Sequence, residues 1–168
     1  MFLIGMTQKA ADEINKPVAE RAQYSEEAAD ICQWHMDIVT INRRKCLILI
    51  NNETGLNLTL FGLRKQQFEN IDHVIRGSLK QLFQLLEVNE SVIEYMLKQA
   101  EELYYSEPKS EEVLSLIKEV KLKVEEKTKG LNYEEIDAVA INFHNNCNAD
   151  YPALDFEKPY EMFAKYFQ

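Results

Sequence analysis

The chain has 168 residues, of which 46% are hydrophobic and 28% charged, with 5 Gly, 4 Pro and 3 Cys. This composition is that of an ordinary globular protein and excludes a fibre, a disulfide-rich scaffold and a mostly disordered chain. The 19 basic and 28 acidic residues give a formal net charge of −9, which disfavours general binding to nucleic acid or anionic lipid. A chain of this length is expected to form a single compact domain over residues 1–168.

The sequence predicts a cytoplasmic protein. Its longest uninterrupted apolar run is the five residues 46–50, whereas a membrane-spanning helix needs about 20. Residues 1–6 are apolar but have no basic start and are followed at once by polar residues, so they are not expected to be a secretory signal. In a reducing compartment, Cys32, Cys46 and Cys147 are expected to be free thiols.

The first predicted element is a short helix over residues 8–16. Thr7 is a suitable N-cap for it, and Pro17 would end it because proline lacks the amide donor. The Ala- and Glu-rich residues 18–30 fit a further helix or a mobile connection, and the sequence leaves both open.

Three runs rich in Ile, Leu, Val, Thr and aromatic residues then predict β-strands, over residues 31–41, 45–51 and 56–61. The first two runs are separated by Asn42-Arg43-Arg44, and the second and third by an Asn-rich turn that ends at Gly55. Loops this short force neighbouring strands to pair antiparallel. The prediction is a three-stranded antiparallel meander, or a slightly larger sheet.

After Gly62 the apolar residues recur with a period of 3.6, which predicts helices. Residues 103–105 either end one of these helices or form a short edge strand, and residues 137–143 fit a helix or an alternating strand. Ser110 is the expected cap of the next helix, and Pro159 suits the first turn of the last one. The expected inward-facing residues of four helices are Ile71, Val74, Ile75, Leu79, Leu82, Phe83 and Leu86; Val92, Ile93, Met96, Leu97 and Ala100; Val113, Leu116, Ile117, Val120 and Val124; and Met162, Phe163, Tyr166 and Phe167. The predicted fold class is α+β, with the meander packed by about five helices.

Two short motifs suggest metal or nucleophilic chemistry. Cys32-Gln-Trp-His35 and His144-Asn-Asn-Cys147 each place a thiol and an imidazole three residues apart, and together they would supply the four N and S ligands of tetrahedral zinc. Cys147 with His144 is also the one local candidate for a nucleophilic dyad. Buried thiols and hydrogen-bonded histidines explain the same residues without any activity. A small metal-dependent or nucleophilic hydrolase using His35 and His144 is therefore the alternative, and no cofactor is predicted.

A basic turn is the stronger candidate for a binding site. Residues 43–80 contain seven basic and three acidic residues, a local charge of +4, so the rest of the chain carries −13. Asn42-Arg43-Arg44-Lys45 holds three consecutive cations in a tight turn, and the planar fork of arginine suits phosphate or carboxylate. The alternative is a charged hairpin tip that prevents pairing at a sheet edge.

The run from Trp34-His35 through Asn42-Arg43-Arg44-Lys45 to Asn51, followed by Gly-Leu-Arg at residues 62–64, resembles an uncharacterised bacterial and archaeal domain family. In that family a Trp-His strand leads to Asn-Arg-Arg-Lys and then to Gly-Leu-Lys/Arg, and Asn142 lies in a similar C-terminal segment. The resemblance implies a bacterial origin and no known activity, and it does not include Cys32 or Cys147.

The sequence thus predicts a non-catalytic intracellular binding domain that recognises an acidic protein or an anionic ligand. A homodimer formed through the aromatic last helix is left open. The candidate binding residues are Trp34, His35, Asn42, Arg43, Arg44, Lys45, Arg64 and Asn142, with Lys65 beside them.

Overall fold

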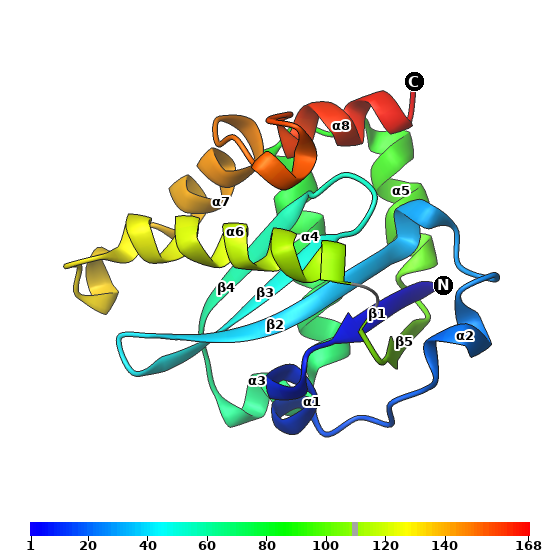
Figure 1. Cartoon of the computed structure of the whole chain (residues 1–168), viewed down its shortest axis with the longest axis horizontal. Helices are drawn as coiled ribbons and strands as arrows, with labels where there is room; N and C mark the ends of the chain where they lie inside the picture. Colours follow the sequence, from blue (N-terminus) through cyan, green and yellow to red (C-terminus); the bar gives the residue numbers. More distant parts are fainter. Residues whose placement is uncertain (109–110) are drawn as a thin grey trace.

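The computed structural model describes residues 1–108 and 111–168, and it is an α+β fold built on a five-stranded mixed sheet of order β4-β3-β2-β1-β5 (Figure 1). The strands are β1 (Phe2–Met6), β2 (Gln33–Ile41), β3 (Arg44–Asn51), β4 (Asn57–Leu63) and β5 (Leu103–Ser106). The helices are α1 (Gln8–Ile14), α2 (Arg21–Tyr24), α3 (Lys65–Glu69), α4 (Ile71–Leu85), α5 (Glu90–Gln99), α6 (Glu111–Thr128), α7 (Ala138–Cys147) and α8 (Pro159–Tyr166), with short 3₁₀ turns η1 (Asp30–Cys32), η2 (Tyr133–Glu135) and η3 (Pro152–Leu154).

The predicted meander is present, but it is only part of the sheet. β2, β3 and β4 pair antiparallel in chain order, whereas β1 lies between β2 and β5 and is parallel to both. A three-stranded antiparallel sheet is therefore too small, and the sheet is mixed. The sequence did not predict β1, because a strand buried on both faces gives a continuous apolar run with no alternation.

Apolar side chains cover both faces of the sheet. Trp34, Met36 and Ile38 of β2 belong to a core formed with α1, α3, α4, α5 and α8. Val39 and Ile41 point to the other face, where they pack in a second core with α6. Figure 1 shows α6 crossing one face of the sheet, with α4 on the opposite side.

Most predicted helices form, with corrected ends. Thr7 caps α1 as predicted, but the helix ends at Asn15, which has a left-handed φ of 51°, before Pro17 is reached. Of the segments left open, residues 18–30 contain α2 and lead into η1, residues 103–106 form β5, and a helix begins at residue 138. In α8 only Phe163 is fully buried among the residues expected to face inward, and Tyr166 is 42% exposed. The predicted cap at residue 110 lies outside the described residues.

None of the described helices is long and apolar enough to cross a membrane. The three cysteines are free, with Cys32 and Cys46 buried and Cys147 partly buried.

Candidate functional site

The β2–β3 hairpin ends in a two-residue turn that projects Arg43 into solvent. Asn42 and Arg43 have φ values of 51° and 62°, and positive φ at both central residues is the type I′ geometry that matches the twist of paired strands. Asn tolerates this conformation well. The Arg43 side chain is exposed and forms none of the salt bridges found among residues 1–108 and 111–168.

The turn is fixed to the segment that follows α6. Asn42 Nδ2 donates a hydrogen bond of 2.9 Å to the carbonyl oxygen of Leu131. The guanidinium carbon of Arg44 lies 3.6 Å from the centre of the Tyr133 ring, within the range of a cation–π contact. Tyr133 in turn donates from Oη to the carbonyl oxygen of Phe61 at 3.4 Å. The hairpin tip is therefore held by contacts from a segment about ninety residues further along the chain.

A β-bulge brings Arg64 to the same end of the sheet. Lys45 pairs with Leu63 but Leu47 pairs with Leu60, so one extra residue is inserted in β4. Gly62 has a φ of +64° there, and a Cβ atom at this position would lie 2.3 Å from Tyr133 Oη. Glycine is thus required both for the backbone conformation and for the position of the tyrosine.

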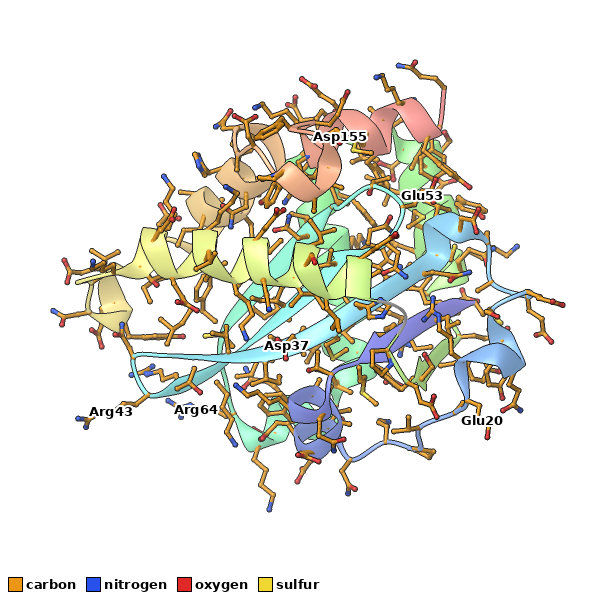
Figure 2. The ribbon with its side chains drawn as sticks, viewed as in Figure 1. Glu20, Asp37, Arg43, Glu53, Arg64 and Asp155 are labelled. Atoms are coloured by element: carbon orange, nitrogen blue, oxygen red, sulfur yellow. The ribbon has the colours of Figure 1, made fainter. Side chains whose placement is uncertain are left out.

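Arg64 follows this bulge, and Figure 2 shows its side chain and that of Arg43 pointing outward at the hairpin end of the sheet. The backbone N–H of Arg64 donates to Gln67 Oε1 at 2.6 Å, while its side chain is exposed. We call this surface the basic end. It consists of Asn42, Arg43, Arg44, Lys45, Arg64 and Lys65.

The cations of the basic end differ in how far they are already neutralised. Lys45 Nζ lies 2.8 Å from Glu13 Oε2, whereas Lys65 and Glu69 are 4.0 Å apart and strongly exposed, a pair that contributes little. Arg43, Arg44 and Arg64 form no salt bridge within the described part of the chain. The arginines therefore carry the available charge.

The last two basic residues of the positive segment 43–80, Arg76 and Lys80, lie on α4 and not at the basic end. Arg76 donates from Nη1 to the carbonyl oxygen of Ala100 at 3.4 Å, which places it near the end of α5. The segment therefore does not fold onto one face, and its contribution to the basic end comes from residues 43–65.

Trp34 and His35 do not form one pocket, because successive residues of a strand point to opposite faces. Trp34 is fully buried in the core on the α4 side, with its ring centre 5.4 Å from that of Phe2. His35 is fully buried on the opposite face, with Nδ1 2.8 Å from Asn52 Oδ1. Neither side chain belongs to the basic end.

Asn142 also lies away from the basic turn and closes the β4 edge of the sheet. Its Oδ1 accepts from the N–H of Thr59 at 2.8 Å, and its Nδ2 donates to the Thr59 carbonyl at 3.0 Å. Asn146, one helical turn later, makes the same pair of bonds to Asn57, at 2.9 and 2.8 Å. The two amides pair with β4 as a neighbouring strand would, which removes an exposed edge.

The two histidines of the alternative hypothesis are not brought together. His144 lies on α7, which runs along β4, whereas His35 lies on β2, and β3 separates β4 from β2. The spacing of the strands alone therefore places the two histidines about 10 Å or more from each other. Burial, followed by the positive charges of Lys127, Lys123 and Lys158, lowers the pKa of His144. Among the described residues, no group of three or more His, Cys, Asp and Glu is placed to hold a metal ion.

The sequence did not reveal the residues that support the basic end. Leu131 and Tyr133 contact the hairpin from far along the chain, and the one local signal near them is the Asn132–Glu135 capping box that opens η2. A capping box predicts where a turn begins but not what the turn contacts.

The fold and the basic end define an α+β domain with a mixed sheet and an arginine-bearing hairpin supported by a distant turn. The chain belongs to the family DUF6933, described as a domain of unknown function, whose model matches residues 3–162. Membership of an uncharacterised family was what the sequence resemblance implied. Neither the curated proteins nor the solved structures gave a match to the chain.

Proposed function

We propose that the protein is a binding domain whose basic end recognises an acidic segment of a partner protein in the bacterial cytoplasm. The observation that carries the proposal is the set of three arginines at the basic end, Arg43 and Arg44 of the tethered hairpin and Arg64 after β4, which form no salt bridge within the described part of the chain. The free cysteines fit a reducing compartment.

The position of the hairpin in the sheet supports a binding role over edge protection. Charges on an edge strand prevent pairing with other chains. β3 lies between β2 and β4, whereas β1 pairs only with residues 33–36 of β2. Arg43 lies in the turn and Arg44 begins the inner strand β3, so neither lies on the part of β2 that β1 leaves uncovered, and the β4 edge is covered by asparagines.

The support of the hairpin favours carboxylate recognition. The guanidinium carbon of Arg44 lies 3.6 Å from the centre of the Tyr133 ring, so a cation–π contact holds the side chain. A carboxylate binds the planar N–H fork of an arginine by two parallel hydrogen bonds. Because the side chain is already held, less conformational entropy is lost when the partner binds.

The charge of the rest of the chain favours a short acidic segment over a long polyanion. Outside residues 43–80 the chain carries −13, and such a body repels a nucleic acid that extends beyond the basic end. A protein segment with a few clustered Asp and Glu residues contacts the arginines without approaching that body.

The test is the binding of a fluorescein-labelled peptide of twelve glutamates, followed by fluorescence anisotropy at 50 mM and 300 mM NaCl. The double variant Arg43→Glu/Arg64→Glu is expected to lower the affinity at least about tenfold, because two attractive charges become repulsive. Wild-type binding should weaken at the higher salt, since both arginines are exposed and screened.

The matched control is Lys98→Glu/Lys165→Glu, which reverses two exposed lysines on α5 and α8. Each double variant moves the net charge from −9 to −13, so general repulsion of the peptide changes equally. If both variants lose the same affinity, recognition does not depend on the basic end and the proposal fails.

A further inference from the structure

A polar strip runs along the face of β2 that is turned toward α6. Gln33, His35 and Asp37 are spaced two apart, so their side chains share a face, and each is at most 8% exposed. Asp37 is well satisfied: its carboxylate accepts from Thr7 Oγ1 at 2.5 Å and lies 3.2 Å from Lys121 Nζ. Buried polar groups are nearly always hydrogen-bonded in this way.

Arg21 reaches the other end of this strip and is not satisfied. Its Nη2 donates to Gln33 Oε1 at 2.5 Å, but its Nη1 is buried with no hydrogen-bond partner. Arg21 forms no salt bridge with any residue whose side chain the structure describes. Burial lowers its pKa, and no acidic neighbour acts in the opposite direction. A half-buried guanidinium without a counter-charge is unusual, because charged groups taken out of water are normally paired.

A second unsatisfied donor lies on the same strip. Asn52 Oδ1 is 2.8 Å from His35 Nδ1, while Asn52 Nδ2 is buried with no hydrogen-bond partner among the described residues. The backbone N–H of Asn52 donates to the Gln33 carbonyl at 3.0 Å. Gln33 thus contacts Arg21 through its side chain and Asn52 through its backbone.

We infer that Arg21 and Asn52 bind a small oxyanion, a carboxylate or a phosphate, at the start of β2. Both unpartnered groups are N–H donors and one carries a positive charge, so the complementary ligand is an anion with at least two acceptor oxygens. Both residues are themselves partly exposed, which puts the buried nitrogens just beneath the surface.

The acidic residues beside them in the chain, Glu20 and Glu53, are exposed, and among the described residues neither forms a salt bridge with Arg21. Figure 2 labels both, with Glu20 at the outer margin of the molecule. The proposed anion site does not rest on the basic end. Gln33 begins β2 and the hairpin tip follows its last residue, a separation on the order of 25 Å along the strand.

The test is thermal unfolding at constant ionic strength and pH 7, with sodium chloride replaced by 50 mM sodium phosphate or sodium acetate. A ligand that binds only the folded state raises the Tm, and we expect a rise of about 2–4 °C in the salt that supplies the ligand. A rise with phosphate alone assigns a phosphate site, and a rise with acetate alone or with both assigns a carboxylate-type site. No rise with either salt overturns the inference.

Variants locate the effect. Arg21→Gln should abolish the Tm rise, whereas Arg43→Gln/Arg64→Gln at the basic end should keep it. An equal rise in Arg21→Gln would mean that the anion acts elsewhere. Should that variant unfold, titration of the ¹⁵N-labelled wild type replaces it: the side-chain resonances of Asn52 NH₂ and Arg21 Nε should move saturably with the active anion, and unmoved resonances overturn the inference.

Discussion

Asn142 of α7 and the arginines of the basic end were predicted to belong to the same binding surface, and the structure places them in opposite surroundings. Asn142 and Asn146 direct both atoms of each amide to the β4 backbone and are at most 6% exposed. Arg43 and Arg64 are exposed and form no salt bridge among the described residues. A polar side chain whose hydrogen bonds are all used inside the fold contributes to stability, whereas one held outward is available to a partner.

The largest expected effect is on the asparagine side of this comparison. Asn146→Ala leaves the N–H and carbonyl of Asn57 unpaired in a buried position, which should lower the free energy of unfolding by about 2–4 kcal/mol. Urea denaturation measures the loss. Binding of the acidic peptide by the folded fraction should be unchanged.

Asn148→Ala is the matched control, because Asn148 ends the same helix but is exposed. Its stability should change by less than about 0.5 kcal/mol, and so should that of Arg43→Ala at the basic end. If Asn146→Ala proves as mild as these two, water replaces the amide at the β4 edge and the contrast between the two regions disappears.

A smaller effect is expected at Tyr133, whose substitution should change both stability and peptide affinity. Tyr133→Leu removes the ring beneath Arg44, so it should cost about 1 kcal/mol of stability and also weaken binding of the acidic peptide a few-fold. Tyr133→Phe keeps the ring and loses only the 3.4 Å bond to Phe61, so its peptide affinity should match that of the wild type. Equal peptide affinity in all three proteins would show that the position of Arg44 is irrelevant to binding.

The local elements of the fold were predictable because their signals are local. The I′ turn between β2 and β3 is signalled by Asn42 between two β-rich runs, and the buried stripe of α6 follows a 3.6-residue period. The parallel strands were not predictable in this way. β1 pairs with residues 33–36 and 103–106, and no turn in the sequence announces partners so far along the chain.

Some residues of the candidate site were likewise predictable from local sequence, and others were not. The charge and exposure of Arg43 follow from its place in a tight turn, so sequence reasoning found it. The Tyr133 support and the approach of Arg21 to Gln33 depend on how distant segments pack, which no local pattern encodes. Asn142 lies against β4 and not at the basic end, and the sequence could not separate the two positions because an asparagine suits surface binding and buried amide pairing equally well.

The smallest expected effect is on the pH dependence of stability, and it arises from His144 on α7. His144 lies on the same helix as the asparagines, and burial with the nearby charges of Lys127, Lys123 and Lys158 lowers its pKa below 6.5. The folded state therefore binds this proton less readily than the unfolded state, so stability is lost as the pH falls below about 6.5 and levels off once the folded-state pKa is passed. His144→Gln should show a shallower fall in the free energy of unfolding between pH 7 and pH 5 than the wild type. A wild-type slope in His144→Gln would mean that burial and the lysines leave the pKa of His144 the same in the folded and unfolded states, against this prediction.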